Sequence, residues 1–168
     1  MRPRYDFLSD PDDLVGTGEN GEVLIRGCGM MQGYYNRPEK TAQAFYGGWY
    51  HSGDLGRVDE EGYLWITGRL DDAIIIGVDN IYPQEIEEVL MEHPAVLDAA
   101  VVGVPCEGCT KTLTAFVVTR DNNLTPEILE GFLRESDRLA AFKIPATYNF
   151  VLELPRTYTG KLLRYLLK

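Results

Sequence analysis

Three short polar segments of the sequence carry side chains that could perform chemistry, and the first ends in Asp54. It follows the aromatic segment 49–53, which closes in a glycine and predicts a turn before a strand. An ionised aspartate accepts hydrogen bonds at both oxygens, so Asp54 could hold two adjacent hydroxyl groups of a ribose. A turn-capping aspartate would have the same local sequence, and this segment alone favours that simpler role.

The second segment combines one cation with two acids, Arg69, Asp71 and Asp72. The planar guanidinium group of Arg69 suits a hydroxyl or phosphate acceptor. Asp71 lies where a chain that swivels between two orientations would concentrate its change of backbone torsion. A salt-bridge cluster on the surface is the competing interpretation.

The third segment, residues 154–161, is a turn-rich loop that presents Lys161 just before a predicted helix. An ammonium group on a long stem can offset negative charge between a carboxylate and a phosphate. Many lysines at such positions are only solvated. The phosphate-binding P-loop is excluded, because that motif needs a glycine and a hydroxyl where Pro155 and Leu162 stand.

Two thiols, Cys106 and Cys109, have a spacing that can bind zinc or form a redox pair. There is no second pair of cysteines, and neither histidine is near in sequence, so we predict no metal site. With Cys28 the cysteines form an odd set, which argues against a secreted disulfide framework and favours reduced thiols.

The bulk composition indicates a folded protein, since 45% of the 168 residues are hydrophobic and 25% are charged. A net charge of −10 excludes a duplex nucleic acid as a partner. No apolar run is long enough for a membrane span, and the first residues lack a signal-peptide core. These features predict a soluble, cytoplasmic protein.

The pattern of strands and helices changes after Arg69. Residues 21–68 read as strands, such as 22–26 and 63–67, separated by glycine-rich turns. A helix is predicted from Pro83, and a second is predicted after the Thr125 cap. The remaining predicted elements are strands at 73–76, 96–104, 112–119 and 147–152, a turn at 79–80, and a terminal amphipathic helix.

This order predicts an α+β protein with a boundary at residues 70–72. Residues 71–168 would form a small α/β sandwich-like module of order ββαββαβα. Residues 1–70 would be the β-rich end of a larger domain whose earlier part is missing.

Five segments in order carry a family resemblance that covers nearly the whole chain: residues 21–41, 49–55, 62–72, 80–87 and 155–164. Together they resemble the adenylate-forming, AMP-binding superfamily of acyl- and aryl-CoA synthetases, luciferases and peptide-synthetase adenylation domains. The resemblance implies that residues 1–70 end the large N-terminal AMP-binding domain and that residues 71–168 are the mobile C-terminal domain. It also implies ATP with Mg²⁺, CoA and a carboxylic acid as substrates.

The resemblance implies a role for each matching residue. Asp54 would hold the nucleotide ribose with the help of Arg69, and Asp71 would be the hinge. Lys161 would bridge the substrate carboxylate and the α-phosphate during adenylation. The residues implied at the CoA tunnel are Gly77, Val78, Asn80 and Phe142.

Departures from the family pattern occur in three segments. The tunnel loop commonly reads Gly-Gly-Glu-Asn, and here Val78 replaces the second glycine, which predicts a narrower tunnel. Segment 106–111 replaces a usual Asp-x-x-x-Gly-Glu pattern. In segment 142–146 the one basic residue is Lys143, and further basic residues that some aryl-CoA ligases carry after the phenylalanine are missing, so the mode of contact with the CoA nucleotide stays open.

Within the superfamily, segments 69–72, 80–83 and 159–164 favour an acid:CoA ligase over a peptide-synthetase adenylation domain. The family's phosphate loop, adenine site and acid pocket lie upstream of these residues. We therefore expect the chain alone to be inactive. The alternative is a stand-alone partner-binding or regulatory module derived from this domain.

Overall fold

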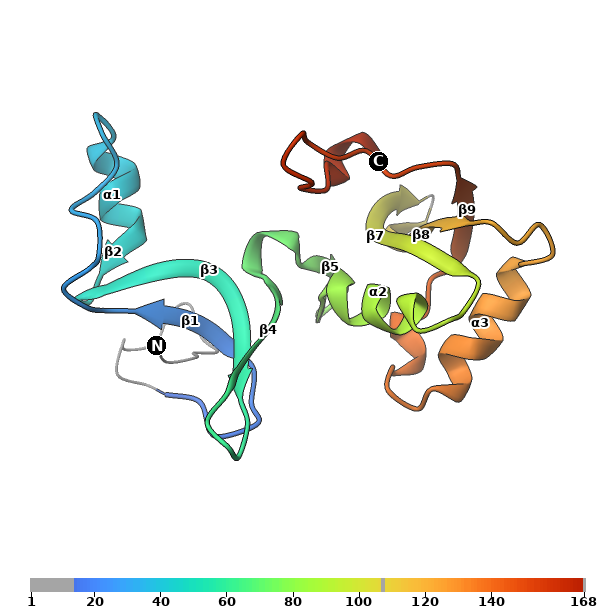
Figure 1. Cartoon of the computed structure of the whole chain (residues 1–168), viewed down its shortest axis with the longest axis horizontal. Coiled ribbons are helices and arrows are strands. Elements are labelled where there is room, and N and C mark those ends of the chain that lie inside the picture. Colours follow the sequence, from blue (N-terminus) through green and yellow to red (C-terminus); the bar gives the residue numbers. More distant parts are fainter. Residues whose placement is uncertain (1–13, 107, 168) are drawn as a thin grey trace. The chain divides into compact units, whose positions relative to one another are not determined.

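The computed structural model describes residues 14–106 and 108–167, which form two compact units that meet between Asp71 and Asp72 (Figure 1). Three helices, nine strands and three 3₁₀ turns occur in the described residues. The α+β fold class is confirmed. None of the described helices is long and apolar enough to cross a membrane.

The first unit is built on one antiparallel sheet whose long central strand pairs with all the others. Its strands are β1 (Gly21–Ile25), β2 (Phe45–Tyr46), β3 (Trp49–Val58) and β4 (Leu64–Arg69), and β3 pairs with β1, β2 and β4. Strand β3 is strongly curved (Figure 1). It contains Gly53 at φ +71°, and its register with β4 shifts between Leu55 and Gly56. Such a shift bends a strand locally.

Segment 49–53, predicted as a turn before a strand, is therefore part of strand β3 itself. Residues of β3 pair with residues of β1 that are more than 20 positions away in the sequence, for example His51 with Leu24. This long-range pairing supplies backbone partners that no local signal reveals.

Helix α1 (Pro38–Ala44) was not predicted from the sequence. Pro38 begins it, as suits the first helical position, and the Thr41 hydroxyl donates to the Arg37 carbonyl at 2.9 Å. None of its residues is buried. Without a buried apolar face the helix has no hydrophobic period to detect.

The second unit contains a three-stranded sheet and two helices that pack on it. The sheet has the order β7 (Val96–Cys106), β8 (Cys109–Thr119), β9 (Thr147–Val151); β7 and β8 are antiparallel, and β8 and β9 are parallel. The parallel pair requires a crossover, which α3 (Pro126–Glu135) provides. Helix α2 (Pro83–Met91) follows a small hairpin of β5 (Ile74–Ile76) and β6 (Asp79–Ile81).

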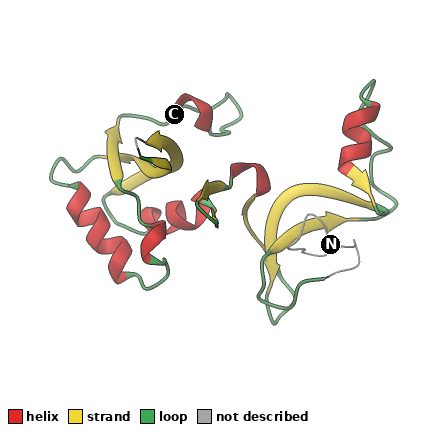
Figure 2. Ribbon diagram, turned by 180° about the vertical axis from the view of Figure 1, so that it is seen from behind, coloured by secondary structure: helices red, strands yellow, loops and turns green. Residues whose placement is uncertain are grey.

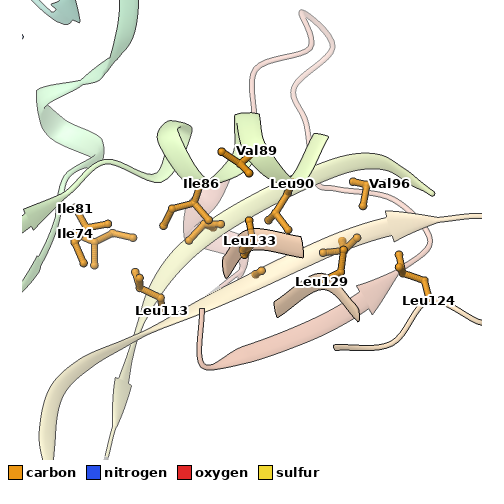
Figure 3. Close-up of a cluster of buried hydrophobic side chains, with 14 residues drawn as sticks. Ile74, Ile81, Ile86, Val89, Leu90, Val96, Leu113, Leu124, Leu129 and Leu133 are labelled. Atoms are coloured by element: carbon orange, nitrogen blue, oxygen red, sulfur yellow. The ribbon is translucent and has the colours of Figure 1, made fainter. Parts of the chain in front are cut away.

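Both helices begin where their local signals indicate. Pro83 and Pro126 occupy the first turn of each, and the Thr125 hydroxyl accepts from the Ile128 amide at 3.4 Å. Figure 3 shows their apolar side chains converging on the sheet. The cluster includes Ile86, Val89 and Leu90 of α2, Leu129 and Leu133 of α3, and Leu113, Ala115 and Val117 of β8. Each large aliphatic side chain buried here contributes about 1.5–3 kcal/mol.

The terminal amphipathic α-helix predicted from the sequence is not formed. The segment instead has an isolated bridge between Arg156 and Leu162, followed by a 3₁₀ turn, η3 (Arg164–Leu167), seen near the C-terminal label (Figure 2). The Leu163 amide donates to the Pro155 carbonyl at 2.8 Å, so it is not available for a helix. None of the η3 residues is buried, so no apolar face stabilises a longer helix.

The cysteines differ from the prediction at one position. Cys28 is an exposed free thiol, as expected. Cys106 is disulfide-bonded, so the prediction of reduced thiols is wrong there.

Candidate functional site

The first unit brings Asp54 and Arg69 together across two neighbouring strands. They are direct partners in the β3 and β4 register, and the Arg69 guanidinium donates from Nη1 to Asp54 Oδ1 at 2.8 Å. Their side chains are 36% and 42% exposed, respectively, so a ligand hydroxyl can reach both. The sequence interval of 15 residues gives no hint of this contact; the hairpin register creates it.

A buried carboxylate supports the backbone beside Asp54. Glu22 Oε1 accepts from the Gly53 amide at 3.1 Å, and Glu22 Oε2 lies 2.8 Å from His51 Nδ1. The Glu22 and His51 side chains are only 11% and 7% exposed, respectively. The His51 ring also stacks on Tyr46, with centroids 3.4 Å apart. Glu22 thus ties β1 to the residue that precedes Asp54.

Sequence reasoning missed this role of Glu22. The available signal was a charged residue with only Gly21, Val23 and Leu24 beside it in the sequence. All three of these neighbours are buried in β1. A buried carboxylate needs partners. His51 Nε2 is buried and has no hydrogen-bond partner among the described residues.

A hollow of about 730 Å³ in the first unit opens beside these residues. Its lining includes Tyr34, Tyr50, His51, Arg69 and Asp71. The Tyr34 and Tyr50 hydroxyls lie 3.4 Å apart, and this hydrogen bond, with burial and the charge of Asp54, raises the pKa of Tyr50. The phenol therefore stays protonated at neutral pH. A hollow of this size with converging polar groups suits a small polar ligand.

The second unit presents Lys161 on a tightly closed loop. The Thr157 amide donates to the Lys161 carbonyl at 2.8 Å, and the Lys161 amide donates to the Thr157 hydroxyl at 3.0 Å. The Gly160 amide donates to the Thr157 carbonyl at 2.8 Å. Lys161 itself is exposed, and its ammonium group forms no ion pair within residues 14–106 and 108–167. These hydrogen bonds fix the backbone of the loop, while the charged Lys161 ammonium group remains accessible to a ligand.

The residues predicted at a CoA tunnel also belong to the second unit. Gly77 and Val78 form the two-residue turn between β5 and β6, with Gly77 at φ +63° and Val78 97% exposed. Asn80 lies in β6 opposite Ile75, so the turn predicted at 79–80 is two residues earlier than expected. Phe142 is exposed in the 3₁₀ turn η2 (Ala141–Lys143). The contact of these residues with CoA stays a prediction.

Asp71 lies in the 3₁₀ turn η1 (Leu70–Asp72), where the two units meet along the chain. A short irregular segment of this kind can absorb a change of φ and ψ without breaking a sheet or a long helix. The structure therefore places Asp71 where the predicted hinge would be, and the hinge role remains a prediction.

Comparison with known proteins finds a family for part of the chain and relatives for most of it. Residues 85–161 match the family model of the AMP-binding enzyme C-terminal domain. A long-chain-fatty-acid–CoA ligase of Bacillus subtilis (strain 168) is 42% identical over 159 residues, which is 94% of this chain and 28% of the relative. A 2-succinylbenzoate–CoA ligase of Geobacillus kaustophilus is 46% identical over 151 residues, covering 89% of this chain and 30% of the relative.

Solved structures show the same fold. An amide bond synthetase from Marinactinospora thermotolerans matches with a TM-score of 0.86 and 38% identity, over 99% of this chain and 33% of its own. The o-succinylbenzoate CoA synthetase of Bacillus subtilis, in complex with its acyl-adenylate intermediate, matches with a TM-score of 0.84 and 38% identity. That match covers 95% of this chain and 32% of the other.

Fold and matches together place the chain in the adenylate-forming, AMP-binding superfamily. Residues 85–161 belong to its C-terminal domain family, and the two curated relatives described above are named as CoA ligases. The chain spans less than a third of the length of these curated relatives.

Proposed function

We propose that this chain is the C-terminal part of an ATP-dependent acid:CoA ligase. The observation that carries the proposal is the division of polar groups between two compact units. The first unit holds the Asp54–Arg69 pair, and the second holds the exposed Lys161 on a closed loop. The relatives' names as CoA ligases and a structural neighbour with a bound acyl-adenylate support the same chemistry.

Two half-reactions would use these groups in turn. In the first, the substrate carboxylate attacks the α-phosphorus of ATP, pyrophosphate leaves, and an acyl-adenylate forms. Asp54 and Arg69 would hold the ribose hydroxyls, and Lys161 would lie against the carboxylate and the α-phosphate, where negative charge is crowded. ATP would arrive with Mg²⁺, which neutralises the phosphates as part of the substrate.

In the second half-reaction, the CoA thiol attacks the acyl carbon and AMP leaves. Rotation about Asp71 would remove Lys161 and bring in the Gly77–Val78 turn, which would line the pantetheine tunnel. The exposed Val78 side chain would narrow that tunnel compared with a glycine at the same position. In this mechanism the chain needs the rest of the N-terminal domain, so residues 1–168 alone would be inactive.

The test is ATP–pyrophosphate exchange by the full-length enzyme with palmitate, benzoate and 2-succinylbenzoate. Lys161→Ala should slow exchange by about 10²–10³-fold, the usual effect of removing one preorganised charge-stabilising group. Thioester formation from presynthesised acyl-adenylate and CoA should stay within about threefold of wild type, because Lys161 acts in one half-reaction only. Tyr158→Ala is the matched control, since Tyr158 is fully exposed in the same loop.

Equal loss of both half-reactions in Lys161→Ala would contradict the assigned role. No exchange with any tested acid would argue against a ligase and for a stand-alone partner-binding or regulatory module.

A further inference from the structure

We infer that Arg164 is a positioning residue, which holds the backbone of the Lys161 loop in the orientation needed for adenylation. The inference rests on the proposed role of Lys161. Arg164 follows Lys161 by three residues, yet its side chain reaches into the second unit rather than into solvent. Its side chain is 17% exposed.

Arg164 binds three separate segments of the second unit. Its Nη2 donates to Glu87 Oε2 of α2 at 2.9 Å, and its Nη1 donates to Glu87 Oε1 and to the Val101 carbonyl of β7, the latter at 3.0 Å. Its Nε lies 3.6 Å from Asp72 Oδ2. Two parallel bonds from a guanidinium to one carboxylate fix both distance and angle.

The positive charge of Arg164 is stable at neutral pH. Burial tends to lower the pKa of Arg164, but the hydrogen bond and charge of Glu87, with Asp72, outweigh it and raise the pKa overall. Glu87 in turn accepts from the Val101 amide at 2.6 Å. Arg164 is thus a permanently charged link between α2, β7 and the residue after Asp71.

A second arginine holds the other end of the loop. The Arg156 Nη2 donates to both carboxylate oxygens of Asp98, at 2.8 and 2.9 Å, and its Nη1 donates to the Gly160 carbonyl at 2.9 Å. Lys161 lies between these two anchors. The Arg156 contact is more exposed, so solvent weakens it more than the Arg164 contact.

The contacts of Arg156 and Arg164 hold the backbone at Lys161 in one position. With the loop backbone held at both ends, only the lysine side chain must be ordered when the substrate binds. A displacement of about 1 Å in a catalytic group can cost about a hundredfold in rate, so the anchor matters even though Arg164 would not touch the substrate.

The informative substitution is Arg164→Lys. It keeps a positive charge opposite Glu87, whose side chain is 13% exposed, so the fold is preserved, but it loses the fork that fixes the angle. Removing the charge with Arg164→Ala would leave Glu87 unpaired and risk unfolding. Arg134→Lys is the matched control, because Arg134 pairs with Glu130 on the exposed face of α3.

The experiment measures both half-reactions in the full-length enzyme, with whichever of palmitate, benzoate and 2-succinylbenzoate gives the fastest exchange. Arg164→Lys should slow acyl-adenylate formation by about 10- to 100-fold. Thioester formation from presynthesised adenylate and the KM for ATP should both stay within about twofold. Arg134→Lys should change neither half-reaction.

A double variant distinguishes positioning from general damage. If Arg164 acts through Lys161, then Lys161→Ala combined with Arg164→Lys should be no slower in adenylation than Lys161→Ala alone. Multiplied effects, or equal loss in both half-reactions, would overturn the inference. Full adenylation activity in Lys161→Ala itself would instead refute the proposed function, so the two failures are distinguishable.

Discussion

Replacing Glu22 by alanine should destabilise the first unit, because Glu22 holds two buried polar partners. The substitution removes the acceptor of the Gly53 amide and the partner of His51 Nδ1. His51 Nε2 already has no partner among the described residues, so both ring nitrogens would then be unpaired. Because Gly53 precedes Asp54, the carboxylate proposed to bind the ribose would also lose its backbone support.

The expected magnitude follows from these two contacts. Each buried polar group left without a partner costs about 1–3 kcal/mol. Two such groups, allowing for partial relaxation, should lower the free energy of unfolding by about 2–4 kcal/mol. Glu22→Gln keeps an oxygen that can accept from Gly53, so its effect should be about half as large.

Urea denaturation followed by tryptophan fluorescence measures this effect in the 168-residue chain. Both tryptophans, Trp49 and Trp65, belong to the first unit, so the signal reports on that unit and not on the second. Glu19→Ala is the control, since Glu19 is an exposed carboxylate that accepts one local backbone bond. Its effect should stay within about 0.5 kcal/mol. A loss in Glu22→Ala no larger than in Glu19→Ala would refute the reasoning.

Two further predictions follow from the site and the core. In the full-length enzyme, Asp54→Ala should raise the KM for ATP about tenfold or more, as loss of a charge-assisted bond to ribose implies, whereas Asp59→Ala in the same unit should not; an unchanged KM would remove Asp54 from the nucleotide site. In the second unit, Gly103→Ala would place a Cβ 2.5 Å from Ile74 Cγ2 in the core, and should cost about 1–3 kcal/mol in thermal unfolding followed by circular dichroism. Gly131→Ala in α3 meets no atom within 4 Å and should stabilise by up to about 1 kcal/mol, so equal effects at the two glycines would contradict the packing described here.

The sequence by itself determined the elements whose signals are local. The first-turn prolines and the Thr125 cap marked α2 and α3, because these residues act within one turn of the helix start. Alternating and β-branched runs marked β7 and β8. The order of five segments along the chain was enough to predict the superfamily, and the family match and the curated relatives agree with that prediction.

Only the tertiary structure decided which distant residues meet. The contact of Asp54 with Arg69 depends on the β3–β4 register, and the support from Glu22 depends on the pairing of β1 with β3. The C-terminal segment was predicted as a helix from its own periodicity. It forms a bridge and a 3₁₀ turn because its backbone bonds within the loop and Arg164 binds a carboxylate 77 residues away. Such contacts connect positions far apart in sequence, so no local pattern of residue types can reveal them.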